Sequence, residues 1–370
     1  MVAGLTLSTA APAAAKPQPL STVTTTAVTE IMASLMTKSS STDPRYLSRN
    51  VWYDGSPDCF RCTFGPGVLA ARHGVRTGTG SNASTKAAIG SFDLAIKNHQ
   101  RSDGAFGPAA PGEGGLDIQT VLFANELAQA YLLLGDRLDA AHKKQWAASL
   151  TKAADWLIAN GNLKWYINGN LNLAITINMD LTYRITKAGR FKTAAATSLS
   201  FLLNPPQQRW KGFGLQYTKK PKKADGSDGA GFLAESGGQA PGYDPAYTLV
   251  QTNLAAFWYL LTNSPDAKRL TNLTYNQLLP RVRKSDWTLD VSGGTRRMAP
   301  GIRYRFSTSA LPVLALKGGR TDLQKEVQSQ LTITLKDYKG ATTYQHAAYS
   351  FSFGSELTPT YLVLTTTKGW

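Results

Sequence analysis

Three separate segments of this 370-residue sequence combine amide, aromatic and charged side chains close to apolar runs. The first segment contains Trp165, Tyr166, Asn168, Asn170 and Asn172. Asn168 and Asn172 lie four residues apart, so they share one face if a helix begins there. Side-chain amides in such a position can stabilise negative charge on a bound oxygen. Asparagine is also common in turns and at helix N-caps, and these structural roles are the alternative explanation.

The second segment is a loop rich in Gly and Pro before the apolar run 249–261, and its polar candidates are Glu235, Gln239, Tyr243, Asp244 and Tyr247. Asp244 suits the N-cap of a helix, and Pro245 suits the first turn. A tyrosine hydroxyl can accept or donate a proton during a reaction. We favour Tyr243 over Tyr247, because a loop position before the cap points toward the mouth of a groove. Packing as core aromatics is the alternative for both tyrosines.

The third segment is basic and aromatic, and its candidates are Arg296, Arg297 and Arg303. Arginine binds carboxylates through two parallel contacts, although a solvated surface would have the same composition. Two further candidates lie elsewhere in the chain. His346, in an aromatic stretch, could transfer a proton, and Asp103, in a Gly-rich turn, could bind a substrate. A structural role is the alternative for the lone histidine.

Apolar residues recur at helical spacing along most of the chain. The pattern predicts about a dozen helices in pairs, at 27–36, 84–98, 117–134, 138–159, up to 185, 191–203, 247–262, 267–282, 306–316, 323–335 and 358–366. In most pairs one helix is strongly apolar and opens from a Gly-rich loop, and the other has a charged face. Alternation typical of strands is scarce, and its best candidate is 330–335.

Antiparallel helix pairs of this kind can close into a double ring. We therefore predict an all-α fold, an α/α toroid of about six helical hairpins with long Gly-rich loops and little β structure. The loops that open the inner helices would gather at one end of the ring. We expect the loops 165–172, 235–247 and 296–305 to border one groove there.

The toroid would form a single catalytic domain over residues 25–370. Before it, residues 1–15 combine a short apolar run with three consecutive alanines, which is typical of the end of a secretory signal peptide. An Ala- and Thr-rich tail is the alternative. Residues 16–24 have the Pro, Thr and Ser content of a linker. We therefore expect a secreted protein.

Composition limits the cofactors and partners of the chain. No segment reaches about eighteen uninterrupted apolar residues, so we expect no membrane span. Cys59 and Cys62 are the only cysteines. They are too few for a zinc site, and in a secreted protein they predict a local disulfide. The net charge of +16 leaves acidic polysaccharide, nucleic acid, anionic membrane and cell-wall polymer as possible partners, and the absence of a nucleic-acid-binding motif makes nucleic acid the weaker candidate. We expect a monomer and no metal or other cofactor.

The helix pattern and two motifs resemble the secreted α/α-toroid polysaccharide lyases, the group that includes chondroitin, hyaluronate, heparin and alginate lyases. The segment Trp-Tyr-x-Asn-Gly-Asn at 165–170 is similar to the helix-opening motif whose Asn neutralises a uronate carboxylate in those enzymes. The segment Gly-Tyr-Asp-x-x-Tyr at 242–247 is similar to the loop that carries their catalytic Tyr. The resemblance implies metal-independent β-elimination, with an anionic polysaccharide that contains uronate as the substrate, and the net charge of +16 would attract such a polyanion.

Elimination removes the proton at C5 of a uronate, which becomes acidic only when the neighbouring carboxylate charge is neutralised. We expect the catalytic residues to be Asn168, Asn170, Tyr243, Tyr247, His346 and Asp244. We expect the substrate to be bound by Asn172, Trp165, Tyr166, Glu235, Gln239, Arg296, Arg297, Arg303 and Asp103.

Two other functions fit the same sequence. An inverting glycoside hydrolase on the same toroid needs two carboxylates roughly 6.5–9.5 Å apart. Four carboxylates lie at the ends of loops that lead into predicted helices: Asp103, Asp117, Glu235 and Asp244. A non-catalytic protein that binds cell-wall glycan would need neither an acid nor a base.

Overall fold

The computed structural model describes residues 18–37, 64–78, 82–107, 115–164, 166–237, 240–296, 299–344 and 352–370. In these parts the chain is mainly helical, and its strands are few and short. This confirms the predicted helical fold class with little β structure. The strand candidate at 330–335 is wrong, because these residues lie within the long helix α11 (Gln324–Tyr344). Across the described ranges, none of the helices combines the length and the hydropathy that crossing a membrane requires.

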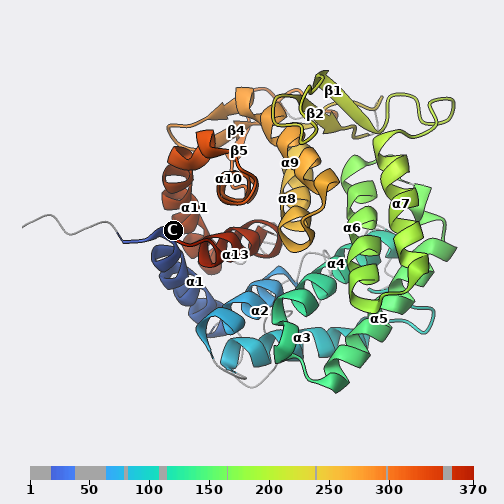
Figure 1. Ribbon diagram of the computed structural model, residues 1–370, viewed down its shortest axis with the longest axis vertical. Coiled ribbons are helices and arrows are strands. Elements are labelled where there is room, and N and C mark those ends of the chain that lie inside the picture. Colours follow the sequence, from blue (N-terminus) through green and yellow to red (C-terminus); the bar gives the residue numbers. More distant parts are fainter. Residues whose placement is uncertain are drawn as a thin grey trace, which may run out of the picture.

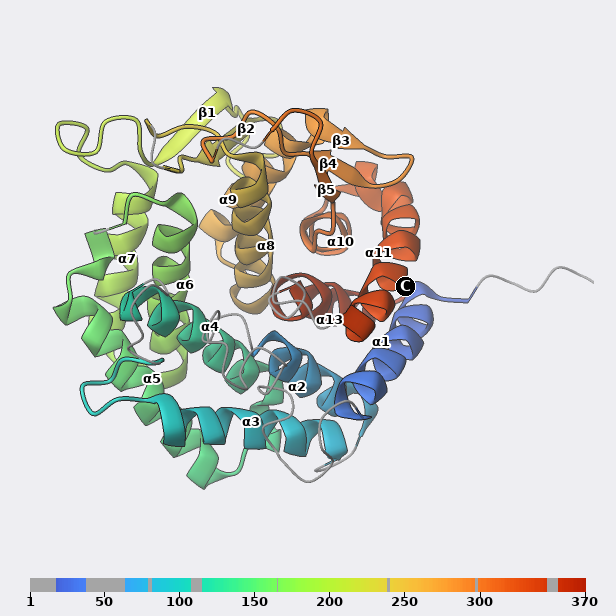
Figure 2. The same ribbon diagram turned by 180° about the vertical axis from the view of Figure 1, so that it is seen from behind.

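The longer helices form two sets that alternate along the chain (Figure 1). The first set is α2 (Gly65–Thr77), α4 (Leu116–Leu134), α6 (Gly169–Thr186), α8 (Pro245–Thr262), α10 (Ala310–Leu316) and α13 (Thr358–Thr366). The second set is α1 (Leu20–Thr37), α3 (Ala83–His99), α5 (Ala140–Ala159), α7 (Gly189–Leu203), α9 (Pro265–Leu278) and α11. First-set helices contact one another in the order α2, α4, α6, α8, α10 and α13, and α13 contacts α2. Most second-set helices lie at the periphery in Figures 1 and 2.

Short elements occupy the connections between these helices. The short helical turns are η2 (Gly135–Arg137), η3 (Asn162–Lys164), η4 (Leu279–Arg281), η5 (Thr321–Leu323) and the π-helical η6 (Phe353–Leu357). An antiparallel hairpin is formed by β1 (Leu215–Lys219) and β2 (Ala230–Leu233). A second antiparallel sheet has the order β3 (Val282–Arg283), β4 (Thr288–Asp290) and β5 (Arg303–Arg305). Both sheets lie in the upper part of Figure 1.

Capping residues determine where several helices begin. The Asp244 side chain accepts a hydrogen bond from Tyr247 N at 3.1 Å and caps α8, as the sequence predicts. Helix α3 begins after Asn82 and not at Ser84, because the Asn82 side chain accepts from Thr85 N at 3.0 Å. The starts of these helices are therefore fixed by local hydrogen bonds.

Helix α1 begins at Leu20, inside the range that the sequence assigns to a linker. Its Thr24, Val28 and Ile31 side chains are fully buried, and the helix contacts α11 and α13. Packing therefore overrides the weak helix preference of a Thr-rich sequence. The predicted signal sequence and the two cysteines lie outside the described residues.

A buried carboxyl group joins the C-terminal elements to the core. The Tyr338 hydroxyl of α11 donates to Glu356 Oε2 of η6 at 2.6 Å, and Ser307 Oγ lies 2.8 Å from the same hydroxyl. Burial raises the pKa of Glu356 to about 7, although the hydrogen bonds from Tyr338 and Ser307 oppose the rise. The neutral acid is therefore favoured inside the fold more than it is in water.

We predict that Glu356→Gln reduces the pH dependence of stability. A carboxyl group whose pKa rises on folding makes the free energy of unfolding fall as pH increases from about 4.5 to about 7. Above about pH 7 the free energy of unfolding no longer falls because of this group, and the total decrease due to Glu356 approaches about 3 kcal/mol. Urea unfolding at about pH 5 and about pH 8 should therefore differ less in Glu356→Gln than in the wild type.

Glu30→Gln is the matched control, because Glu30 is an exposed carboxylate that pairs with Lys339. It should leave the difference between the two pH values unchanged. An undiminished difference in Glu356→Gln would contradict the raised pKa at this position.

Candidate functional site

The N-terminus of α6 packs against the end of β2. Gly169 N donates to Ala234 O at 3.1 Å, and Asn170 N donates to Glu235 Oε1 at 2.7 Å. A β-carbon on Gly169 would lie 2.5 Å from the β-carbon of Leu233, which is closer than two such carbons can approach. Glycine at the first position of α6 is therefore necessary, and it brings Asn170 against Glu235.

Glu235 is fully buried at this contact. Gln251 Nε2 donates to Glu235 Oε1 at 2.9 Å, whereas Oε2 has no hydrogen-bond partner within the described residues. Arg296 Nη2 lies 3.9 Å from Oε2. Burial raises the pKa of Glu235 to about 7, while the hydrogen bonds from Asn170 and Gln251 and the charge of Arg296 oppose the rise. The carboxyl group can therefore change its charge near neutral pH.

Sequence reasoning missed Gln251, the residue that holds Glu235 in place. Gln251 is fully buried in α8. Its Nε2 also donates to Leu233 O at 2.9 Å, and its Oε1 accepts from Leu233 N at 3.2 Å. One side chain thus joins both β2 and Glu235 to α8. The signal in the sequence was a polar side chain inside an apolar run, because a buried amide requires hydrogen-bond partners.

Arg296 connects Glu235 with Tyr247. Its guanidinium carbon lies 3.8 Å from the centre of the Tyr247 ring, which is a close cation–π contact. Gly237 allows the two loops to meet here, because a β-carbon on it would lie 2.5 Å from Thr295 O. The structure therefore brings a predicted tyrosine and a predicted arginine to the carboxyl group beside α6.

Asp244 acts as a helix cap and anchors a loop. Its Oδ1 accepts from Tyr247 N at 3.1 Å. Its Oδ2 accepts from Arg296 N at 3.2 Å and from Thr295 Oγ1 at 3.4 Å. The side chain is fully buried and both oxygens have partners, so this geometry gives Asp244 a structural role. Its expected catalytic role stays a prediction.

Tyr243 lies in different surroundings from Tyr247. Its ring centre is 5.0 Å from that of Phe232 on β2, and the Arg281 guanidinium lies 5.4 Å from it. Burial raises the pKa of Tyr243 to about 12, against the opposing charge of Arg281. The sequence-based preference for Tyr243 therefore does not match the arrangement, in which Tyr247 is the tyrosine beside Arg296.

The three asparagines of the first segment have different surroundings. Asn172 is buried and its Nδ2 donates to the backbone Tyr166 O at 2.7 Å, and Tyr166 is buried too. The substrate contacts expected of these two residues stay predictions. Asn168 occupies the N-cap of α6 without a capping hydrogen bond from its side chain. Asn170 Oδ1 has no hydrogen-bond partner among the described residues. The Glu235 cluster, as we call it, consists of Asn168, Asn170, Glu235, Tyr247 and Arg296.

Arg303 and Asp103 lie outside the Glu235 cluster. Arg303 on β5 donates to Thr288 Oγ1 and Thr288 O, both at 2.8 Å, and to Arg281 O at 3.1 Å. These bonds hold the three-stranded sheet together, so the geometry does not support the expected substrate contact. Asp103 is exposed and accepts from Ala105 N at 3.1 Å, which stabilises the turn between α3 and α4.

Four of the predicted site residues lie outside the described residues: Trp165, Gln239, Arg297 and His346. Their expected roles stay predictions. In the part of the chain that the structure describes, no group of three or more His, Cys, Asp and Glu side chains could hold a metal ion.

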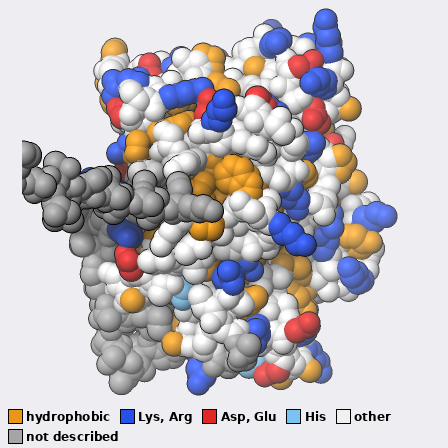
Figure 3. Space-filling view, turned by 60° about the vertical axis from the view of Figure 1, so that its left-hand side comes forward, with side chains coloured by type: hydrophobic (Ala, Val, Ile, Leu, Met, Phe, Trp, Pro, Cys, Tyr) orange, Lys and Arg blue, Asp and Glu red, His pale blue; other side chains and the backbone are white. Residues whose placement is uncertain are grey.

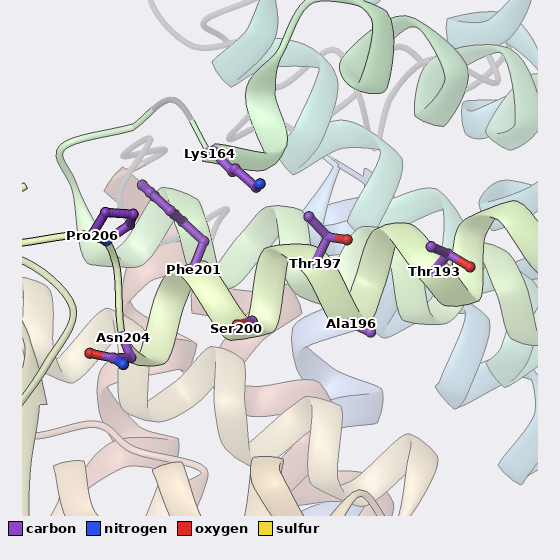
Figure 4. A pocket seen from close by; sticks show the side chains of 8 residues that line it. All are labelled: Lys164, Thr193, Ala196, Thr197, Ser200, Phe201, Asn204 and Pro206. Atoms are coloured by element: carbon purple, nitrogen blue, oxygen red, sulfur yellow. The ribbon is translucent and has the colours of Figure 1, made fainter. Parts of the chain in front are cut away.

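A cavity of about 500 Å³ lies apart from the Glu235 cluster, along α7 and η3 (Figure 4). It is lined by Lys164, Thr193, Ala196, Thr197, Ser200, Phe201, Asn204 and Pro206. None of these residues was a predicted site residue. The cavity therefore gives no support to a second catalytic centre.

Comparison with known proteins supports a polysaccharide lyase. Residues 75–209 match a family model described as the ulvan lyase N-terminal domain. The match extends from the end of α2 to just beyond α7 and includes Asn168 and Asn170, but it ends before Glu235, Tyr247 and Arg296. It does not single out the chondroitin, hyaluronate, heparin or alginate lyases. No curated protein and no solved structure matches the chain.

We predict that Gly169→Ala destabilises the fold by about 1–3 kcal/mol, because the added methyl group has no space beside Leu233. Gly189→Ala is the matched control, since Gly189 is the first residue of α7 and an added β-carbon would have no neighbour within 4 Å. The control should be neutral or slightly stabilising. Urea unfolding measures both variants, and equal stabilities would contradict a required close approach at α6.

Proposed function

We propose that this chain is a polysaccharide lyase that cleaves a uronate-containing polysaccharide by metal-independent β-elimination at the Glu235 cluster. The observation that carries the proposal is the contact of Arg296 with both Tyr247 and Glu235 beside the N-terminus of α6. The family match adds independent support for the class of reaction, because it covers the α6 side of the cluster.

In the proposed reaction the substrate carboxylate lies near the first turn of α6. The amides of Asn168 and Asn170 and the positive end of the helix would stabilise the negative charge that spreads onto this carboxylate. The C5 proton passes to a base, the electrons of the C5–H bond form the C4–C5 double bond, and the C4–O bond breaks. The leaving oxygen then takes a proton. The products are a new chain end and an unsaturated uronate.

Tyr247 is the proton acceptor and donor in this proposal. The Arg296 guanidinium on its ring would stabilise the negative charge that Tyr247 carries while it holds no proton. Glu235 is a positioning residue, because it binds the backbone of Asn170 and lies beside the Arg296 guanidinium. Each of the three side chains thereby has one role that its contacts support.

We also propose that the two sets of helices form an α/α toroid. The support is the circular order of contacts in the first set, which returns from α13 to α2, and the pairing of each first-set helix with a second-set helix. The cluster contains the start of α6 and the start of α8, which are first-set helices. Loops that open inner helices would therefore supply the site, as the sequence pattern predicts.

Secretion belongs to the same proposal. Its support is the apolar, Ala-rich start of the sequence. The net charge of +16 also suits an enzyme that acts on a polyanion, and Lys and Arg side chains are prominent on the face in Figure 3.

The hydrolase alternative gains no support, because both oxygens of Asp244 already accept hydrogen bonds.

We predict that Tyr247→Phe lowers kcat by about 10²–10⁴-fold, because general acid–base catalysis is typically of that size. Tyr243→Phe is the matched control and should keep near-normal turnover, since Tyr243 packs against Phe232 and the guanidinium over its ring, that of Arg281, lies 5.4 Å away instead of 3.8 Å. The assay follows new ultraviolet absorbance from the unsaturated uronate, with ulvan first and then alginate, chondroitin, hyaluronate and heparin. Activity should persist in EDTA.

Full activity in Tyr247→Phe with loss in Tyr243→Phe would move the base to the other tyrosine. New reducing ends without the absorbance would favour hydrolysis. Loss of activity in EDTA that returns with a divalent cation would contradict the metal-independent reaction.

We predict that Glu235→Gln flattens the pH dependence of kcat/KM around pH 7. Ionised Glu235 attracts Arg296 and holds it against Tyr247, and the pKa of about 7 makes this ionised fraction grow as pH rises. Wild-type activity should therefore rise through about pH 7, and the variant should lack that rise. Glu356→Gln is the control, because the pKa of Glu356 is also about 7 but its partners are Tyr338 and Ser307. An unchanged profile in Glu235→Gln would remove Glu235 from this role.

A further inference from the structure

The hairpin of β1 and β2 carries an unusual density of positive charge. Four of the five residues at 219–223, where β1 ends and the turn begins, are lysines: Lys219, Lys220, Lys222 and Lys223. The rest of the turn carries Asp225 and Asp228. All four lysines are exposed. Within the described residues none of the four forms a close ion pair, although the charge of Lys223 acts on the carboxylates of Asp228 and Asp322. We call these four side chains the lysine loop.

Hydrogen bonds fix the backbone of the lysine loop. Asp228 Oδ1 accepts from Lys222 N at 3.2 Å and from Lys223 N at 3.0 Å, so its carboxylate closes the turn through backbone amides. Asn276 Nδ2 of α9 donates to Ser227 O at 3.0 Å and to Gly229 O at 2.8 Å. The turn is thus attached to a helix and held in one conformation.

Holding like charges close together on a fixed turn is unfavourable, because each ammonium group repels the others. A solvated surface does not require such an arrangement, since lysines can be spread out. The fixed turn therefore has the properties of a preorganised anion-binding surface.

The lysine loop is connected to the Glu235 cluster by a short strand. Strand β2 (Ala230–Leu233) begins beyond the turn, and Glu235 follows two residues after its end. At about 3.3 Å per residue, Ala230, the strand partner of Lys219, lies on the order of 15 Å from Glu235, and the other three lysines lie in the turn beyond Lys219. Tyr217 on β1 is also exposed and adds an aromatic surface near the lysines. A polymer bound at the cluster could extend to this hairpin, whereas a single sugar could not.

We infer that the lysine loop is a second binding site for the anionic polysaccharide and holds the part of the polymer that extends beyond the Glu235 cluster. The identity of the polymer rests on the proposed function. The loop would act by charge, so it should affect binding of long chains and leave the chemical step unchanged.

The test uses the full chain with Lys219→Gln, Lys220→Gln, Lys222→Gln and Lys223→Gln combined. The matched control replaces four exposed lysines of α5 and α11, which have no ion-pair partner among the described residues, by glutamine: Lys144, Lys152, Lys325 and Lys336. Both variants lose the same formal charge. Each is also made with Tyr247→Phe, so that binding of intact ulvan, alginate, chondroitin and heparin can be measured.

The lysine-loop variant should bind the polymer that the wild type binds best about tenfold or more weakly at low ionic strength, and the control should change little. The difference should disappear at about 1 M salt, where the Debye length is about 3 Å. For active enzyme, KM should rise for the polymer, whereas kcat and the KM of a short oligosaccharide should not change. If the combined variant melts below the wild type, the pair Lys222→Gln and Lys223→Gln replaces it.

Equal loss of affinity in both variants would mean that only net charge matters and would overturn the inference. Unchanged affinity in the lysine-loop variant, no binding of any tested polyanion by the wild type, or tighter loop-dependent binding of single-stranded nucleic acid would also overturn it. Binding that needs the lysine loop without any unsaturated product would leave the inference standing and defeat the proposed lyase. If the wild type forms the unsaturated product but the lysine-loop variant binds the polymer as tightly as the wild type does, the proposed lyase would stand and the inference about the lysine loop would fall.

Discussion

A buried carboxyl group, that of Glu235, is the interaction on which the site depends. Moving a carboxylate out of water is costly unless hydrogen bonds and positive charge compensate for it. Here Asn170 N and Gln251 Nε2 supply the hydrogen bonds, and Arg296 supplies the charge. These partners come from α6, α8 and the loop before β5, which are far apart in the sequence. The burial of Glu235 therefore requires α6, α8 and the loop before β5 to meet at this carboxyl group.

This arrangement leaves Glu235 only partly compensated. Its Oε2 faces a guanidinium at 3.9 Å, which is beyond hydrogen-bonding distance, and within the described residues it has no other partner. A fully satisfied carboxylate would keep a low pKa and would be a permanent anchor. The incomplete compensation instead makes its charge depend on pH and lets the guanidinium contact the Tyr247 ring. An ion pair with a purely structural role would need neither a carboxyl group that titrates near neutral pH nor a guanidinium shared with a tyrosine ring.

The sequence predicted helix starts better than side-chain roles. Asp244 was recognised as a cap because the capping bond involves residues only three positions apart. The role of Arg303 could not be recognised, since its partners Thr288 and Arg281 lie on other strands and turns. The different surroundings of Tyr243 and Tyr247 could not be predicted for the same reason, and the choice between them as catalytic residue stays a prediction. Phe232, which covers Tyr243, belongs to a hairpin that the helical periodicity did not predict.

The family match and the geometry describe different parts of the site. The match ends at residue 209, so it includes the asparagines of α6 but not Glu235, Tyr247 or Arg296. The asparagines alone are equally explained by capping and turn formation. What distinguishes them is that the carboxyl group of Glu235, two residues after β2, accepts from the backbone N–H of Asn170, while the side-chain Oδ1 of Asn170 has no partner among the described residues.

Arginine and lysine serve different purposes in this chain. The Arg296 guanidinium is planar and stacks on Tyr247, which a compact ammonium group would do less well. The exposed lysines of the hairpin are hydrated point charges, and their attraction extends over a Debye length of about 8–10 Å at moderate salt. In the proposed function a long anionic polymer would use both kinds of charge. Long-range attraction would concentrate the polymer near the protein but could not select one bond. The Arg296–Tyr247 pair, 3.8 Å apart, would act only on the sugar unit that had already reached it.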